Sequence, residues 1–144
     1  MNDATNWLAG QRKNDLRVFS GSAWVVQHPE WTAYTPTITA NTGAFTTVSA
    51  AGRYIRVGSA LHINVVITVT TNGTAAGFVI LPLPTGITSQ SAALIPGREN
   101  GVSRTMLQGV IGASGTNFNI FDYANNYPAA NGASLIMTGV IEVI

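Results

Sequence analysis

Apolar and polar residues alternate most clearly in the stretch "ALHINVVITVTT", residues 60–71. Successive side chains of a β-strand point to opposite faces, so the pattern predicts a strand with one face in a core and the other toward water or a partner. A shift of one residue would expose five aliphatic side chains at about 1.5–3 kcal/mol each, which specifies the register firmly. The apolar set is Leu61, Ile63, Val65, Ile67 and Val69, and the polar set includes His62, Asn64, Thr68 and Thr70.

Short runs of this kind recur from Trp31 to the last residue. They are rich in Val, Ile, Thr and aromatic residues, and turn sequences such as "NTG", "PTG" and "ASG" separate them. A spacing of about 8–12 residues between turns is typical of β-sandwiches and barrels. No stretch keeps a helical period beyond a turn or two. We therefore predict an all-β fold, an antiparallel β-sandwich of jelly-roll-like type, over residues 31–144.

The first 30 residues are predicted to form a linker and a short β-hairpin. The strands are expected at Leu16–Phe19 and Ala23–Val26, around a turn in which Gly21 supplies the positive φ. Trp24 and Trp31 lie in apolar or β-branched surroundings, and we expect them to be packing anchors where the hairpin meets the following domain.

The last predicted strand, "SLIMTGVIEVI", is apolar on both faces, with Glu142 as its only charge. Such a strand belongs either in the middle of a sandwich against a second layer or at a subunit interface. We favour an interface near a symmetry axis. "GFVILPLP" has the same two-sided character until Pro82 and Pro84 end its ladder.

Charge is scarce in this chain of 144 residues. Charged residues make up 9% of it, against about 25% in typical globular proteins, while hydrophobic residues make up 46%. Mixed surface charge normally keeps monomers dispersed and protects sheet edges, so we expect a symmetric oligomer to cover part of this surface. The net charge of +1 and the scattered basic residues argue against nucleic acid as a partner.

Cysteine is absent, which excludes disulfides, thiolate metal sites and cysteine nucleophiles. No apolar run approaches the ~20 residues that span a bilayer, so the protein is not expected to be membrane-inserted. The N-terminal sequence lacks the features of a signal peptide, and we expect synthesis in the cytoplasm of the producing cell.

Few residues could carry catalysis. Of six carboxylates, Glu99 and Asp122 form the only pair in the loop-rich region that could flank a glycosidic bond, and we expect both to be solvated loop charges rather than a catalytic pair. No nucleophile-elbow motif occurs. His62 is expected to be exposed or interfacial, the alternative being a metal on a trimer axis bound by three copies of it. We therefore predict no enzyme activity, no resident metal and no cofactor.

Binding residues are expected in "NFNIFDYANNYPAANGA", residues 117–133. Aromatic rings can pack on the apolar face of a sugar, and amide or carboxylate groups can pair with its hydroxyls. The alternative is structural, with Phe118, Ile120 and also Phe121 in the core and "YANNYP" as a plain turn. The candidate ligand-binding residues here are Asp122, Tyr123, Asn125, Asn126 and Tyr127.

A second candidate lies in "PGRENG", residues 96–101, where a Pro-Gly turn is expected to bring Arg98, Glu99 and Asn100 together. Arg98 and Asn100 could recognise an acidic sugar, or Arg98 could form an ion pair between subunits. The ion pair is the interpretation we favour.

Three stretches carry a resemblance to a known family: "NDLRVFSGSAWVVQ", "WTAYTPTITANTGAFTTVSAAGRYIRVGSALHINVVITVT" and "GFVILPLP". A Gly-Ser-x-Trp hairpin followed by a "W-T-x-Y-T-P-T" lead-in resembles the distal domains of tail fibres, tailspikes and related prophage virion proteins of tailed bacteriophages. The resemblance covers residues 14 to about 84, and the ending "LIMTGVIEVI" is similar to the closing strand of such domains.

The resemblance implies a homotrimer at the tip of a virion tail appendage. Such a tip would bind a bacterial surface glycan or an outer-membrane receptor, with carbohydrate the favoured ligand, and would stabilise the trimer. Two alternatives stay open, a polysaccharide-degrading enzyme fragment and a purely structural trimerisation cap. Repeats of the kind that build a fibre shaft are absent from the chain.

Overall fold

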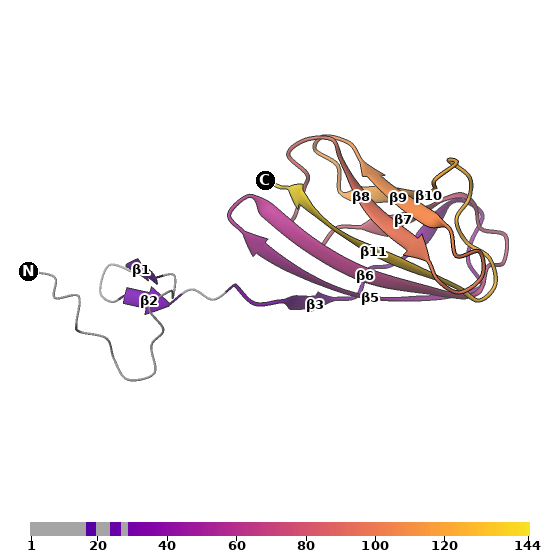
Figure 1. Ribbon diagram of the computed structural model, residues 1–144, viewed down its shortest axis with the longest axis horizontal. Coiled ribbons are helices and arrows are strands. Elements are labelled where there is room, and N and C mark those ends of the chain that lie inside the picture. The colour runs from indigo at the N-terminus through magenta and orange to yellow at the C-terminus, as the bar shows by residue number, and fades with distance from the viewer. Residues whose placement is uncertain (1–16, 20–23, 27–28) are drawn as a thin grey trace, which may run out of the picture. The chain divides into compact units, whose positions relative to one another are not determined.

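The computed structural model describes residues 17–19, 24–26 and 29–144, and the chain divides into two units, residues 1–30 and 31–144. In the first unit, β1 (Arg17–Phe19) pairs antiparallel with β2 (Trp24–Val26), with Phe19 opposite Trp24 (Figure 1). The predicted hairpin strands are thus present. Leu16, Gly21 and Ala23 lie outside the described residues.

The second unit is one antiparallel sheet of nine strands in the order β3-β5-β6-β11-β8-β9-β10-β7-β4. Figure 1 shows this sheet curled, so that β3, β5, β6 and β11 form one layer and β7 to β10 the other. Within the described residues the fold is all-β and antiparallel, as predicted, but the two layers belong to one continuous sheet. Its strands are β3 (Thr32–Tyr34), β4 (Thr39–Thr42), β5 (Thr47–Val57), β6 (Ala60–Thr71), β7 (Ala76–Pro82), β8 (Ala93–Glu99), β9 (Met106–Ile111), β10 (Asn117–Asp122) and β11 (Ala133–Glu142).

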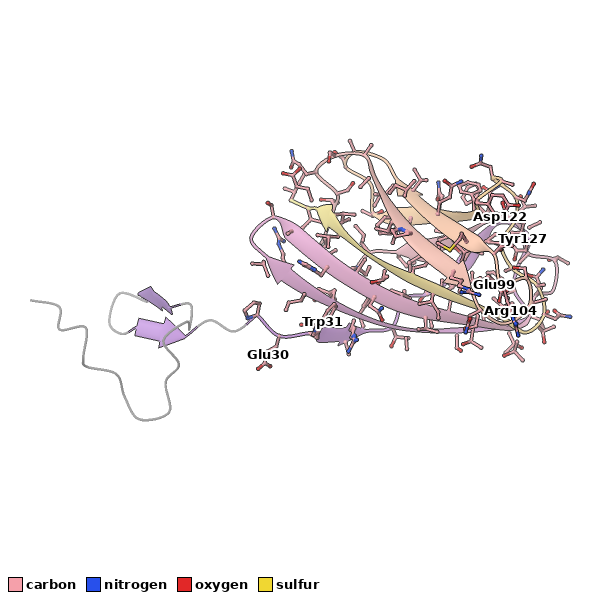
Figure 2. All side chains as sticks on the ribbon, in the orientation of Figure 1. Glu30, Trp31, Glu99, Arg104, Asp122 and Tyr127 are labelled. Carbon is pink, nitrogen blue, oxygen red and sulfur yellow. The ribbon has the colours of Figure 1, made fainter. Side chains whose placement is uncertain are left out.

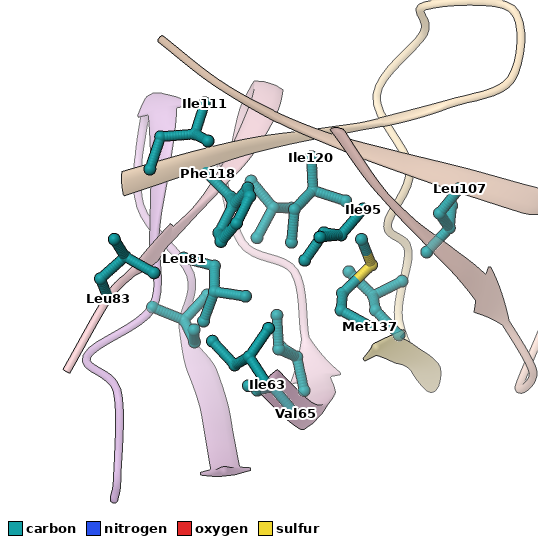
Figure 3. Packing of buried hydrophobic residues seen from close by; sticks show 14 of the residues in the cluster. Ile63, Val65, Leu81, Leu83, Ile95, Leu107, Ile111, Phe118, Ile120 and Met137 are labelled. Atoms are coloured by element: carbon teal, nitrogen blue, oxygen red, sulfur yellow. The ribbon is translucent and has the colours of Figure 1, made fainter. Parts of the chain in front are cut away.

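The core lies between the two layers and is built from the inward-facing side chains of every long strand. The alternation of β6 is confirmed, since its five odd-numbered aliphatic residues from Leu61 to Val69 are at most 1% exposed. Figure 3 shows Ile63 and Val65 of this strand facing Leu81, Phe118 and Ile120 of the opposite layer. Phe118 and Ile120 are fully buried, so the structural interpretation of these two residues is confirmed.

β11 occupies the middle of the sheet, between β6 and β8. Leu135, Met137 and Ile141 point into the core, whereas Val140 on the opposite face is 53% exposed. Within one chain the second face of β11 therefore lies on the outside of the sheet and is not covered by a second layer, and the favoured subunit interface stays a prediction. β7 ends at Pro82, where a proline was predicted to end the ladder.

The sheet bends sharply between β11 and β8. The two strands share only three residue pairs, Leu135–Glu99, Ile136–Arg98 and Met137–Gly97, whereas β11 and β6 share ten. At this corner a Cβ atom on Gly97 would lie 2.6 Å from the carbonyl oxygen of Ile136 and against Met137. The predicted turn at residues 96–101 is therefore wrong, since residues 96–99 belong to β8 and Gly97 allows close packing of strands instead.

Candidate functional site

Four connections lie at one end of the nine-stranded unit, including residues 43–46, which pair with Thr71 and Thr74. The candidate site is built from the other three, residues 72–75, 100–105 and 123–132. The strand register places them there, because Ala133 lies opposite Val69 and Leu135 lies opposite Glu99. Figure 2 shows Glu99, Arg104, Asp122 and Tyr127 gathered at this end, with Trp31 toward the other end of the same unit. We call these three connections the loop end.

Asp122 organises the turn after β10. Its Oδ1 accepts hydrogen bonds from the backbone N–H groups of Ala124 (2.8 Å) and Asn126 (2.7 Å), and its Oδ2 accepts one from Asn126 Nδ2 (3.2 Å). The hydrogen bond from the Asn126 backbone, with smaller contributions from its side chain and from Ala124, lowers the pKa of Asp122. An Asp side chain that bonds to its own following backbone is a typical turn former.

Gln108 of β9 fixes the tip of the same turn. Its Nε2 donates to Asn125 Oδ1 (2.7 Å) and to the carbonyl oxygen of Asp122 (3.2 Å). Asn125 takes the left-handed conformation with φ 64°, which Asn tolerates better than most residues. The turn is thus held by hydrogen bonds to Asp122 and to Gln108, and its shape does not depend on a ligand.

Tyr127 links two connections of the loop end by a hydrogen bond. Its hydroxyl donates to Asn72 Oδ1 at 2.6 Å, and the Asn72 backbone N–H donates to Asn131 Oδ1 at 2.7 Å. Burial raises the pKa of Tyr127 despite the hydrogen bond to Asn72. Tyr127 therefore joins the loop after β10 to the β6–β7 turn, a structural role.

Tyr123 is the side chain of this loop that is most available to a partner. It is 70% exposed, and Asn125 and Asn126 next to it are also exposed. An aromatic ring flanked by amides on a fixed backbone offers an apolar face and hydrogen-bonding groups together. The structure thus brings all five predicted residues together at residues 122–127. Asn125 and Asn126 are exposed, but their side chains form hydrogen bonds that help to hold the turn, and Tyr123 is 70% exposed.

Glu99 differs from the prediction of a solvated loop charge, because it is only 1% exposed. Its Oε1 accepts from the N–H groups of Gly101 (2.6 Å) and Ser134 (2.9 Å), and its Oε2 accepts from those of Val102 (2.8 Å), Ser103 (2.5 Å) and Arg104 (3.0 Å). Burial acts to raise the pKa of Glu99, but the backbone N–H groups outweigh it and lower the pKa to about 2. The loop at residues 100–105 is therefore wrapped around a buried carboxylate.

The other two predicted binding residues lie apart from this carboxylate. Arg98 is exposed on the outer side of β8, opposite Met106 and Ile136, because neighbours along a strand point to opposite faces. The Asn100 backbone pairs with Ser134, and its side chain is exposed. The expected grouping of Arg98 and Glu99 in one turn is thus wrong.

A small pocket of about 120 Å³ lies between the loops at residues 100–105 and 122–133. It is smaller than the roughly 300–1,000 Å³ typical of small-molecule sites, so it suits part of a ligand rather than a whole one. Of the seven predicted binding residues only Asp122 and Tyr127 line it. The other lining residues are Glu99, Val102, Ser103, Thr105, Pro128, Ala129, Ala130 and Ala133.

Glu99 and Asp122, the two carboxylates considered for glycoside hydrolysis, both line this pocket. Each accepts hydrogen bonds from its own loop, and each has a lowered pKa. A general acid needs a raised pKa, so the electrostatics of both residues oppose that role.

Asn72 and Gln108 were not predicted as parts of the loop end. "Asn72-Gly73" signalled only a turn, and Gln108 lies inside a predicted strand, so neither carried a local sign of its long-range hydrogen bond. His62 is exposed on the outer face of β6, as expected. No cluster of three metal-binding side chains occurs among the described residues.

None of the elements in the described part of the chain is a helix with the length and apolar character needed to cross a membrane. No family model matches this chain, and no curated protein or solved structure matches it either.

Proposed function

We propose that this protein is the tip domain of a bacteriophage tail fibre or tailspike. It binds carbohydrate on the bacterial surface through its loop end and is carried on the virion as a homotrimer. The proposal starts from the resemblance of residues 14 to about 84 to such tips, and the observation that carries the binding role is the Asp122 turn.

That turn presents Tyr123, which is 70% exposed, on a backbone held by Asp122 and Gln108. A rigid loop loses little conformational entropy on binding, so modest contacts can give useful affinity. Three copies on one tip would multiply that affinity on a dense glycan surface. The loop end also lies away from Trp31, where the chain enters the nine-stranded unit (Figure 2), as a receptor-facing surface should.

Binding can be tested on an array of bacterial capsular and lipopolysaccharide glycans. We expect the wild-type chain to bind a subset of them, and Tyr123→Ala to weaken that binding about tenfold or more, as loss of a central aromatic contact does. Leu94→Ala is the matched control, because Leu94 is 56% exposed on a strand outside the loop end. Glycan binding that is unaffected by Tyr123→Ala would mean that the loop at residues 122–127 is not the binding site.

Two other results would replace the proposal. No binding to any glycan by a folded oligomer would favour a trimerisation cap. Release of oligosaccharides by the wild type that is lost in the Glu99→Gln or Asp122→Asn variant would favour a hydrolase. The lowered pKa values of both residues oppose that role.

A further inference from the structure

The chain holds three Asn-Gly pairs, and each lies in a different connection of the loop end. They are residues 72–73, 100–101 and 131–132. Asn and Gly favour turns, which explains why the pairs gather where strands are connected. An Asn that precedes Gly is also open to deamidation, because glycine has no side chain to hinder attack by its own backbone nitrogen. The loop end therefore concentrates three sites of possible chemical change.

We propose that Asn100 is a site of spontaneous deamidation in the folded protein, with a rate set by the hydrogen bond between Gly101 and Glu99, and that hydrogen bonds of the fold protect Asn72 and Asn131. This modification needs no enzyme, cofactor or partner chain. It is therefore independent of the receptor-binding proposal.

The reaction consumes one water molecule and releases ammonia. The Gly101 nitrogen loses its proton to water or hydroxide and attacks Asn100 Cγ. A bond forms between these two atoms, the bond between Cγ and Nδ2 breaks, and Nδ2 takes up a proton and leaves as ammonia. Water then adds to one carbonyl carbon of the resulting five-membered imide and breaks one of its C–N bonds. The product is aspartate, or isoaspartate in which the main chain runs through Cβ and Cγ.

Two conditions control the rate of the first step. The Asn side chain must rotate until its Cγ atom lies about 3–3.5 Å from the following nitrogen, the separation at which bound groups react. The N–H group on that nitrogen must also be free to lose its proton. A hydrogen bond that holds either the amide or the N–H group has to break first, so each such bond slows the reaction.

Asn72 does not meet the first condition. Its Oδ1 accepts a hydrogen bond from the Tyr127 hydroxyl at 2.6 Å, and its Nδ2 donates to the carbonyl oxygen of Ala75 at 2.9 Å. The amide is held at both ends, so it cannot turn toward the Gly73 nitrogen without losing both bonds.

Asn131 meets neither condition. Its Oδ1 accepts a hydrogen bond from the Asn72 backbone N–H at 2.7 Å. The N–H group of Gly132, which would have to lose its proton, donates to the carbonyl oxygen of Val69 at 2.8 Å. Both partners of the reaction are thus occupied.

Asn100 is restrained at one point. Its side chain is exposed, and its backbone N–H donates to Ser134, which leaves the side chain free to rotate. The N–H group of Gly101 donates to Glu99 Oε1 at 2.6 Å. A carboxylate acceptor strengthens this bond and opposes a second negative charge on the neighbouring nitrogen. Among the described residues, one hydrogen bond therefore separates Asn100 from the reaction.

Modification of Asn100 would disturb the loop around Glu99. The backbone N–H groups of residues 101–104 all donate to that carboxylate, so one extra main-chain atom at residue 100 would shift them. The new carboxylate would also lie next to the buried charge of Glu99. Val102, Ser103 and Thr105 of this loop line the small pocket, so the change would reach the pocket as well.

Peptide mapping by mass spectrometry tests the proposal on the full wild-type chain, incubated in mildly alkaline buffer at body temperature. We expect Asn100 to be modified at least about threefold faster than Asn72 or Asn131, a difference that one hydrogen bond of ordinary strength can produce. In the chain unfolded by guanidinium chloride, the three pairs should react at similar rates, because these hydrogen bonds are then lost.

Glu99→Gln tests the restraint on Gly101. The variant removes the charged acceptor of the Gly101 N–H, so the rate at Asn100 in the folded chain should rise at least about threefold. Glu30→Gln, a matched change at an exposed position, should leave that rate unchanged.

Tyr127→Phe tests the restraint on Asn72 in the same way. It removes the donor to Asn72 Oδ1, so the rate at Asn72 should rise while the rate at Asn100 stays the same. If Glu99→Gln fails to fold, the comparison of the folded wild type with Tyr127→Phe decides the question.

Three outcomes would overturn the proposal. In the first, Asn72 or Asn131 of the folded wild type reacts as fast as Asn100. In the second, Asn100 stays intact for the time in which the unfolded chain reacts completely. In the third, folded Glu99→Gln deamidates at Asn100 no faster than the wild type. Glycan binding by freshly purified protein is measured separately, so failure of the receptor-binding proposal can be told apart from all three.

Discussion

At the scale of single residues, the Glu99 carboxylate should contribute strongly to stability. Glu99→Gln keeps the size of the side chain but removes the charge and turns one acceptor into a donor that faces backbone N–H groups. We expect the free energy of unfolding to fall by about 2–4 kcal/mol, measured by urea denaturation. Glu30→Gln, an exposed matched change, should alter it by less than about 0.5 kcal/mol. Equal effects of the two variants would contradict this role.

The same carboxylate makes stability depend on pH. The pKa of Glu99 is lowered to about 2 in the folded chain from 4.5, so its charge stabilises the fold fully above about pH 4.5. That contribution, roughly 3 kcal/mol, is lost as pH falls from about 4.5 to 2. Asp122 adds a contribution of the same sign, because its pKa is also lowered. Denaturation curves between pH 6 and 2 should show a shallower dependence for Glu99→Gln than for the wild type.

Two tyrosines provide a matched pair of hydroxyl deletions. The Tyr34 hydroxyl is buried and has no hydrogen-bond partner among the described residues, whereas the Tyr127 hydroxyl donates to Asn72. Tyr34→Phe should leave stability unchanged or raise it by up to about 1 kcal/mol, and Tyr127→Phe should lower it by about 1 kcal/mol. Thermal unfolding of both variants checks the difference, and the opposite order would contradict the assigned hydrogen bonds.

At the scale of strands, Gly97 should be essential to the corner between β11 and β8. A methyl group there meets Met137 and the Ile136 carbonyl, so Gly97→Ala should cost about 1–3 kcal/mol. Gly112→Ala is the control, because nothing lies within 4 Å of the Cβ that it would add. A calorimetric midpoint that falls for Gly97→Ala and stays unchanged for Gly112→Ala is the expected result. A tolerated Gly97→Ala would mean that the corner can relax.

The strands could be predicted from the sequence, but the sharp bend of the sheet between β11 and β8 could not. Alternation in β6 is a local signal, because each residue's face follows from its neighbours. The bend at Gly97 depends on Met137, forty residues away, whereas the local pair "PG" predicts a turn. The burial of Glu99 could not be predicted for the same reason, since Ser134, whose backbone N–H donates to its carboxylate, is also distant in sequence. At residues 122–127 a turn could be predicted because its Asn and Pro residues are local in sequence, whereas its hydrogen bonds to Gln108 could not, and the binding role of these residues stays a prediction.

At the scale of the whole molecule, self-association should couple to stability. If copies bind only when folded, a higher protein concentration favours the folded oligomer. The thermal midpoint of the wild type should therefore rise with concentration. Differential scanning calorimetry over a hundredfold concentration range measures it. A wild-type midpoint that is independent of concentration would argue against a folded oligomer.

The central place of β11 has a consequence for how the chain is made. β11 follows the other strands in the chain, yet it joins the half of the sheet that ends at β6 to the half that begins at β8. During synthesis no strand can bridge the two halves until residues 133–142 leave the ribosome. A message broken before Ala133 would thus yield chains whose two half-sheets lack the strand that joins them.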